Sequence, residues 1–424
     1  MILNFGHTFG HAIEKETGKK HGFCVAEGML LETDNLYIKN KLQCCLSKYG
    51  LPIDITDNLN INNIISYMKC DKKGKKIIIL DDIEKCKIIE YNEEFIKKKL
   101  CKKVMVHYNK VNTGNEIISF TAPGSKSETN RLILLASLGC GETCLKGALI
   151  CDDTLYMIEA LQSFGVDIKF KGNINNGNNQ DIIIKGCEGN FKGINNFGIL
   201  PMEIFTGNSG TCMRFLTPII ATCFHNIEDD NIIIRGDKYM NKRPINGLVD
   251  VLKDCKIEYQ NQYGCPPIKI NLLRKFCGGD IVFGPNGISS QFISGIMMAA
   301  PNAESDTNII ISKLYPSLSF VNLTYEMMLK FNIIIVRVED DENVYYTIKA
   351  DKYTNPPSIE IECDATACIY PMVYSMLSDV NLEISNIKET NKQGDFSLYK
   401  RMINVDTDMS DTSINRVDLD SSDT

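Results

Sequence analysis

The sequence lacks the features that would place it in a membrane or outside the cell. It contains no apolar run of about 18 residues, the length that a helix needs to cross a bilayer. Residues 1–30 hold neither a basic leader nor a continuous apolar core, so a signal peptide is not expected. We therefore predict a cytoplasmic protein that has no membrane partner.

Disulfide frameworks and zinc ribbons are also missing. The 17 cysteines are odd in number, follow no framework spacing and form no CxxC pair. In a long chain without a secretory signal they are typical of free or buried thiols in a reducing compartment. There is no excess of basic residues either, because the formal net charge is −7. This charge argues against general nucleic-acid binding.

The chain is long enough for several hydrophobic cores, and its pattern changes along its length. Residues 1–107 have mostly helical spacing of apolar residues, and the lysine-rich 97–103 fits a solvated helix end better than a site for an acidic partner. Residues 108–115 are expected to be a linker. From 116 to 403 short β-branched strands alternate with helices, which predicts an α/β fold. Residues 404–424, with six Asp and one Arg, predict a disordered acidic tail.

Three of the five histidines lie close together near the start, at His7, His11 and His21. His7 and His11 are four residues apart, so on a helix they share one face, a spacing that can bind a metal ion. A lone histidine is more often structural. The clustering of three favours a metal site.

This stretch resembles the metal-binding region of 3-dehydroquinate synthase, in which an Asn-Phe-Gly-His motif and a later histidine precede a His-Gly pair. The resemblance implies that His7 and His21 bind zinc. It also implies that Asn4 and His11 contact substrate, and Lys72 lies in a stretch similar to the family's later lysine-bearing motif. The family's third zinc ligand and its NAD-binding domain would precede residue 1. We therefore expect the C-terminal part of such a domain, without dehydroquinate synthesis by this chain alone.

The most informative stretch is Ala122–Arg131. A strand-like run, Ile117–Phe120, leads into a Pro-Gly turn, and Lys126 and Ser127 follow where a helix is expected to begin. A helix start has free N–H groups and a partial positive charge, so it can hold a phosphate or carboxylate group. The alternative is an ordinary strand–turn–helix junction with a serine cap.

Three further helix starts in the second part of the chain are polar or basic. They are Gly207–Arg214, Lys242–Pro244 and Ser289–Gln291. Each alone fits simple capping. Together with Ala122–Arg131 they favour a site built from converging helix N-termini, for a substrate with more than one anionic group.

In order and in detail these motifs resemble 5-enolpyruvylshikimate-3-phosphate (EPSP) synthase. The matching segments are Pro123–Arg131, Gly207–Arg214, Arg243–Ile245, Ser289–Phe292 and Asp364–Tyr370. The first two fit this family better than the related UDP-N-acetylglucosamine enolpyruvyl transferases. With the dehydroquinate synthase-like segment in front, the arrangement resembles the multifunctional pentafunctional arom polypeptide.

The resemblance implies an α/β enolpyruvyl transferase fold of repeated βαβαββ units in two globules. It implies transfer of the enolpyruvyl group from phosphoenolpyruvate to the 5-hydroxyl of shikimate 3-phosphate, in the shikimate pathway to chorismate and the aromatic amino acids. That reaction needs no metal or organic cofactor; zinc and NAD would belong to the dehydroquinate synthase part. An association with other polypeptides of the pathway stays open.

The site residues are carried over motif by motif. Lys126 and Arg243 are expected to be catalytic, and Lys126 would contact both substrates. Those expected to hold shikimate 3-phosphate are Ser127, Arg131, Ser289, Ser290 and Ser317. Those expected to hold phosphoenolpyruvate or to support its site are Asn208, Gly210, Arg214, Arg243 and Gln291.

Four positions depart from the family pattern. Thr129 replaces a serine, Phe215 a proline, Phe320 a tyrosine and Asn322 an aspartate. We expect Phe215 to reshape the helix near the phosphoenolpyruvate site. Phe320 is expected to remove a hydroxyl contact to shikimate 3-phosphate.

Length is the larger departure. One globule, from Lys126 to about Glu362, is expected to be nearly complete, and the second is expected to be truncated. We therefore expect weak binding of shikimate 3-phosphate and very low turnover. Two alternatives stay open: a zinc- and NAD-dependent dehydroquinate synthase remnant, and a non-catalytic fragment that assembles with other polypeptides through an apolar face.

Overall fold

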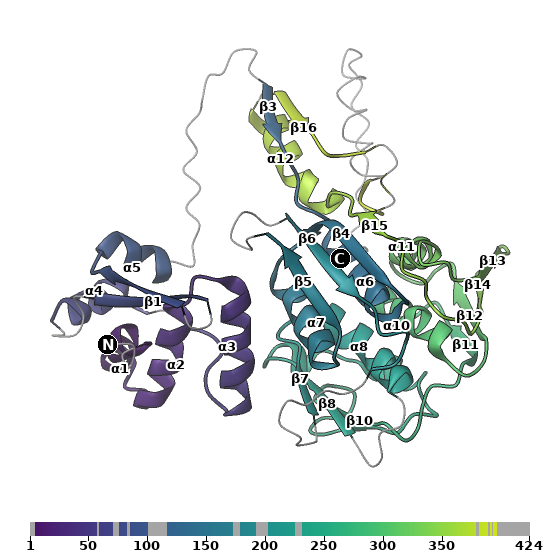
Figure 1. The fold of residues 1–424 in the computed structure, drawn as a ribbon, viewed down its shortest axis with the longest axis horizontal. Coiled ribbons are helices and arrows are strands. Elements are labelled where there is room, and N and C mark those ends of the chain that lie inside the picture. Colours follow the sequence, from purple (N-terminus) through teal and green to yellow (C-terminus); the bar gives the residue numbers. More distant parts are fainter. Residues whose placement is uncertain are drawn as a thin grey trace.

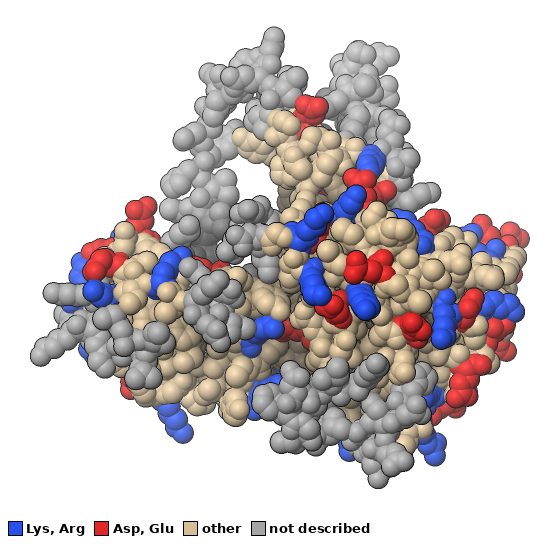
Figure 2. Space-filling view, in the orientation of Figure 1, with Lys and Arg blue, Asp and Glu red and all other residues tan. Residues whose placement is uncertain are grey.

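The computed structural model describes residues 5–56, 59–70, 76–82, 85–100, 117–172, 179–191, 202–224, 231–378, 381–388, 391 and 393–396. They form an N-terminal helical unit (residues 5–100) beside a larger α/β domain (residues 117–396) (Figure 1). The predicted linker (108–115) and acidic tail (404–424) lie outside the described residues. No helix within those ranges is long and apolar enough to cross a membrane. Charged side chains of both signs are interspersed over the face drawn in Figure 2.

The N-terminal helical unit combines helices with one antiparallel hairpin, so the prediction of a mostly helical segment is confirmed. Its elements are α1 (His7–Thr17), α2 (His21–Leu31), α3 (Leu36–Lys48), α4 (Ile61–Cys70), β1 (Lys76–Asp82), β2 (Lys85–Glu90) and α5 (Glu93–Leu100). Phe9, Ile64 and Ile96 are fully buried in its core. The start of α1 lies tightly against α2, because a Cβ atom on Gly28 would lie 2.0 Å from the carbonyl oxygen of Gly6.

The α/β domain repeats one sheet pattern three times. Each four-stranded sheet has one parallel pair followed by two strands in antiparallel order. The first sheet is β15 (Ser358–Glu360), β4 (Glu142–Leu149), β6 (Asn179–Lys185) and β5 (Asp167–Lys171). The second is β7 (Met202–Phe205), β8 (Asn231–Arg235), β10 (Ile268–Asn271) and β9 (Ile257–Tyr259). The third is β11 (Gly279–Phe283), β12 (Thr307–Ser312), β14 (Asn343–Ile348) and β13 (Ile335–Glu339).

Two helices accompany each sheet and complete a βαβαββ unit, as the resemblance implied. The helices before the second strand of each sheet are α6 (Lys126–Leu138), α8 (Gly210–Cys223) and α10 (Ser290–Ala299). Those before the antiparallel strands are α7 (Asp152–Ser163), α9 (Asn246–Val249) and α11 (Leu318–Leu329). Two short 3-10 helices, Met240–Lys242 and Ala300–Asn302, lie in the connections. The predicted α/β enolpyruvyl transferase fold is therefore confirmed for this globule.

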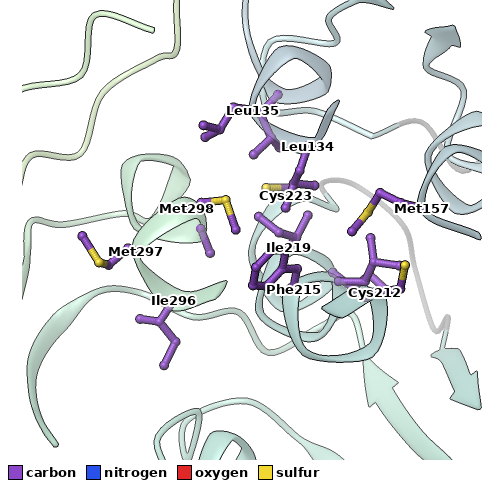
Figure 3. Packing of buried hydrophobic residues seen from close by; sticks show 14 of the residues in the cluster. Leu134, Leu135, Met157, Cys212, Phe215, Ile219, Cys223, Ile296, Met297 and Met298 are labelled. Carbon is purple, nitrogen blue, oxygen red and sulfur yellow. The ribbon is translucent and has the colours of Figure 1, made fainter. Parts of the chain in front are cut away.

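The three inner helices α6, α8 and α10 form the centre of the core. Leu134 and Leu135 of α6 lie near Phe215 and Ile219 of α8, and Met298 of α10 completes the cluster (Figure 3). All five side chains are fully buried. Because the helices share one core, their polar first turns come together at one end of the domain.

A smaller body stands apart from the three sheets at the top of Figure 1. It consists of β3 (Ile117–Phe120), the parallel β16 (Asn381–Ile384) and α12 (Ala365–Ser378). The chain passes between this body and the three-sheet globule twice, where Gly124 and Cys363 form an antiparallel bridge. The amide of Asp364 donates to the carbonyl oxygen of Pro123 at 2.8 Å, which ties the two crossings together.

The N-terminal helical unit contacts the α/β domain mainly through α3 and α7. The hydroxyl of Tyr37 donates to Gln162 at 3.4 Å, and the thiol of Cys44 donates to Glu159 at 2.9 Å. Burial raises the pKa of Cys44, so this thiol stays protonated and remains a donor. This contact places the loop after α3 beside the start of α7.

Glu32 fixes the start of α1 from inside the N-terminal helical unit. Its carboxylate is fully buried and accepts the amide of Gly6 at 2.6 Å. Burial raises its pKa from 4.5 to about 8, although backbone N–H groups act in the opposite direction. The folded state therefore binds this proton more tightly than the unfolded state does, so stability must fall as the pH rises between these two values.

We expect the free energy of unfolding to fall by up to roughly 4 kcal/mol across that pH range, and Glu32→Gln to remove this fall. The amide oxygen of glutamine can still accept from Gly6, so the variant should remain folded. Urea unfolding followed by circular dichroism at several pH values measures the difference between the two proteins. The opposite result would contradict this prediction. If the free energy of unfolding rose with pH in the unsubstituted chain and not in Glu32→Gln, the backbone N–H groups would lower the pKa of Glu32 more than burial raises it.

Candidate active site

The inner helices open onto a cleft of about 1070 Å³. From the α/β domain it is lined by residues at the starts of α6, α7, α8 and α10 and by the loop before α9; these include Lys126, Asp153, Asn208, Gly210, Thr211, Arg214, Arg243 and Gln291. From the N-terminal helical unit it is lined by Lys19, Glu27 and the loop 51–56. A smaller pocket of about 260 Å³ adjoins it and shares Thr211, Arg214 and Gln291.

The three inner helices begin in the same way. Ser125, Ser209 and Ser289 are their N-cap residues, and each serine hydroxyl accepts a backbone amide of the first turn. The remaining N–H groups and the positive ends of the helix dipoles therefore face one region. The prediction that polar helix starts converge is confirmed, and simple capping is part of the same arrangement.

Lys126 is the first residue of α6, and its ammonium lies at the wall of the large cleft. Its Nζ atom is 3.3 Å from Oδ2 of Asp153, and the lysine side chain is half-exposed. The backbone amide of Lys126 donates to the carboxylate of Asp364 at 3.2 Å. Asp364 directly precedes α12, so the smaller body contributes an acid to the start of α6.

Two guanidinium groups converge beside Gly210. A Cβ atom there would lie 3.6 Å from Nη1 of both Arg214 and Arg243, so the absence of a side chain leaves the space between them open. Arg214 donates to Oε1 of Gln291 at 2.8 Å and to the hydroxyl of Ser289 at 3.2 Å. Burial, and then the charge of Arg243, lower the pKa of Arg214. An anion between the two groups would relieve this repulsion.

Arg131 lies behind the smaller pocket and is almost fully buried. It donates to the hydroxyls of Thr324 (2.7 Å) and Ser294 (3.2 Å) and to the carbonyl oxygens of Ser127 (3.0 Å) and Phe320 (3.3 Å). Its guanidinium carbon lies 5.1 Å from the ring centre of Phe215 and 6.0 Å from that of Phe320. Within the described chain no carboxylate pairs with it.

Comparison with known proteins places this geometry in a family. The family model described as EPSP synthase (3-phosphoshikimate 1-carboxyvinyltransferase) matches residues 115–419. The chain belongs to the EPSP synthase family. A second family model, 3-dehydroquinate synthase C-terminal, matches residues 1–74, so both resemblances drawn from the motifs are confirmed.

Curated relatives align with almost the whole chain. The chain is 34% identical to pentafunctional AROM polypeptide 2 of Lodderomyces elongisporus over 427 aligned residues. That alignment covers 93% of this chain and 27% of the relative. It is 32% identical to the pentafunctional AROM polypeptide of Komagataella phaffii over 425 aligned residues, which cover 93% of this chain and 26% of that relative. The chain thus spans about a quarter of the length of these relatives. An EPSP synthase structure from Acinetobacter baumannii superposes on this chain with a TM-score of 0.54 and 22% sequence identity. The superposition covers 68% of this chain and 60% of that one, and it supports the fold alone.

The structure brings the transferase residues singled out by motif into two adjoining pockets of this EPSP synthase-family domain. Lys126, Asn208, Gly210, Arg214, Arg243 and Gln291 line the large cleft. Ser127, Arg131, Arg214, Ser289, Ser290, Gln291 and Ser317 line the smaller pocket. Their roles as ligands of particular substrates stay predictions.

The three histidines of the dehydroquinate synthase-like segment lie close together. The ring centres of His7, His11 and His21 lie 5.4 to 5.7 Å apart, and Nδ1 of His21 is 2.7 Å from Oε2 of Glu14. Among the described residues, no group of three or more His, Cys, Asp or Glu side chains is arranged to hold a metal ion. The assignment of His7 and His21 as zinc ligands stays a prediction, and we derive no step through zinc. Asn4 and Lys72 lie outside the described residues.

Sequence reasoning missed two groups of cleft residues. Asp153, the ion-pair partner of Lys126, belongs to none of the motifs singled out as site residues. Lys19 and Thr56 come from the N-terminal helical unit, where Lys19 donates to Glu27 at 2.9 Å and also contacts the hydroxyl of Thr56. No sequence motif connects them to the transferase site, because their place in the cleft depends on how two units pack.

Proposed function

We propose that the EPSP synthase-family domain transfers the enolpyruvyl group of phosphoenolpyruvate to the 5-hydroxyl of shikimate 3-phosphate. The observation that carries this proposal is the pair of adjoining pockets at the starts of α6, α8 and α10. One is bordered by an ammonium and two guanidinium groups, and the other by serine hydroxyls in front of a buried arginine. Two anionic substrates that must react with each other need such neighbouring sites.

The reaction would proceed by addition and elimination. The 5-hydroxyl loses its proton as its oxygen bonds to C2 of phosphoenolpyruvate, and C3 gains a proton, which gives a tetrahedral intermediate. Phosphate then leaves from C2 and C3 loses a proton, which restores the double bond. Lys126, Arg214 and Arg243 would hold the phosphate and carboxylate charges throughout, and they would stabilise the departing phosphate most strongly.

The shikimate 3-phosphate side rests on hydroxyl and amide donors. Ser289 caps α10, Ser127 lies in the first turn of α6, and Ser317 precedes α11 with φ at 58°. A phosphate between these helix starts would accept hydrogen bonds from all three elements. No metal or organic cofactor enters this scheme. Association with other shikimate-pathway polypeptides and a cytoplasmic location stay predictions.

Calorimetric titration tests the binding half of the proposal. We expect shikimate 3-phosphate to give a saturable heat, and shikimate without its phosphate to bind at least roughly tenfold more weakly because the charge-assisted hydrogen bonds are lost. Higher salt should weaken the binding of shikimate 3-phosphate more than the binding of shikimate, because salt screens the contacts to the phosphate. Absence of heat with millimolar shikimate 3-phosphate, or equal affinity for shikimate, would contradict it.

A further inference from the structure

A side cavity of about 250 Å³ lies between the N-terminal helical unit and the start of α7, and it shares five of its eight lining residues with the large cleft. Its walls come almost wholly from the N-terminal helical unit, with Leu30 on α2, Lys39 and Asn40 on α3, and Ile53 and Asp54 on the following loop. Asp152 is the wall residue from the α/β domain. None of the residues assigned to substrate by motif borders it.

Asn40 is the feature of this cavity that calls for a ligand. Its side chain is 1% exposed, and neither its amide nitrogen nor its amide oxygen has a hydrogen-bond partner within the described chain. A buried amide that pairs with nothing is destabilising, so such groups normally face a partner. A molecule in the cavity that offers both an acceptor and a donor would satisfy Asn40.

Lys39 adds an unpaired cation beside it. This lysine is half-buried, and the described residues provide no hydrogen bond or ion pair to its ammonium. Burial and then the charge of Lys99 lower the pKa of Lys39, whereas Asp152 and Asp54 act in the opposite direction without pairing with it. A carboxylate placed in the cavity would supply the missing counter-charge.

Two carboxylates of the protein also line the cavity. Asp54 and Asp152 are both exposed and can meet a positive group. Leu30 and Ile53 supply the apolar part of the lining. The cavity thus offers a cation, an amide, two anions and an apolar surface within a volume suited to one small molecule.

We propose that this cavity binds a small α-amino acid. The ligand's carboxylate would lie against Lys39 and the amide nitrogen of Asn40, and its ammonium against the amide oxygen of Asn40 and the carboxylate of Asp152. A small or medium apolar side chain would face Leu30 and Ile53. This site adjoins the cleft of the enolpyruvyl transfer proposed above, but none of the residues assigned to that reaction lines it.

Calorimetry and thermal unfolding of the full chain test the proposal with glycine, L-alanine and L-leucine as probes. We expect a saturable heat and a rise of the unfolding temperature at millimolar amino acid. Acetate or methylammonium alone supplies only half of the charge pattern and should bind at least roughly tenfold more weakly. Absence of any heat or shift with all three amino acids, or equal binding of either half-ligand, would overturn the proposal.

Two variants locate the site. Asn40→Leu keeps the volume and removes the unpaired amide, so the chain should fold at least as stably without ligand while losing roughly tenfold or more in affinity. Lys39→Met keeps the stem of the side chain and should lose affinity likewise. Asn62→Ala, at an exposed position on α4, is the control and should bind as the unsubstituted chain does. Unchanged affinity in Asn40→Leu would place the amino acid elsewhere and overturn the assignment.

Discussion

Replacing Lys126 with alanine is expected to lower kcat/KM for enolpyruvyl transfer by roughly 10²–10³-fold. Lys126 begins α6, and its ammonium is positioned at the cleft wall 3.3 Å from Asp153. There it would face the phosphate and carboxylate charges of the substrates, and alanine leaves those charges without this cation. Phosphate release from phosphoenolpyruvate in the presence of shikimate 3-phosphate measures the rate, and calorimetry measures phosphoenolpyruvate binding.

Lys169→Ala is the matched control for this substitution. Lys169 is an exposed lysine on β5 whose ammonium lies 2.7 Å from Asp167, so it shares the ion-paired character of Lys126 but lies outside both pockets. Its loss should leave both rate and affinity almost unchanged, because exposed ion pairs contribute little. Full activity in Lys126→Ala, or equal losses in the two variants, would remove Lys126 from the reaction.

Local sequence patterns were sufficient to predict where the inner helices begin. A serine cap followed by a small or basic residue marks a helix start in one chain segment, and Ser125, Ser209 and Ser289 each fulfil this role. That the three starts meet could be argued from the sequence only as a hypothesis. The reason they meet is the shared core of α6, α8 and α10, which no single segment contains.

Long-range pairing explains what local patterns could not supply. β15 completes the first sheet beside β4, although Ser358 and Cys144 are far apart in the chain. The register of that pair depends on the crossing at Gly124 and Cys363, where two chain segments bridge between bodies. The repeated sheet was therefore predicted through the family resemblance, and its strand pairing required the structure.

Phe215 and Phe320 show the same limit at the level of single residues. Against the family pattern they read as departures that would disturb the site. In the structure Phe215 is a buried residue within α8, and both rings flank the guanidinium of Arg131. The two changes thus occur around one charged group, a relationship that the separation of the residues in the sequence hides.

Replacing Arg131 with methionine is expected to lower the free energy of unfolding by roughly 3 kcal/mol. Burial lowers the pKa of Arg131 to about 10, so it is still a cation at neutral pH. Methionine fills part of the space but leaves the hydroxyls of Thr324 and Ser294 without their charged donor. It also removes the cation from between the rings of Phe215 and Phe320. Because the chain has no tryptophan, urea unfolding is best followed by circular dichroism.

Arg131→Lys and Arg274→Met separate the possible origins of this effect. Lysine keeps the charge, but all its donors are on one nitrogen atom. It cannot reach all the hydroxyls and carbonyl oxygens that the planar guanidinium contacts. Arg131→Lys should therefore also lower the free energy of unfolding. Arg274 is exposed, and its replacement should change stability by less than about 0.5 kcal/mol. If both Arg131 variants kept full stability and lost only affinity for shikimate 3-phosphate, Arg131 would be a ligand contact alone. Loss of both together is what its burial behind the smaller pocket predicts, because the same side chain holds α6, α10 and α11 in register and supports the serines in front of it.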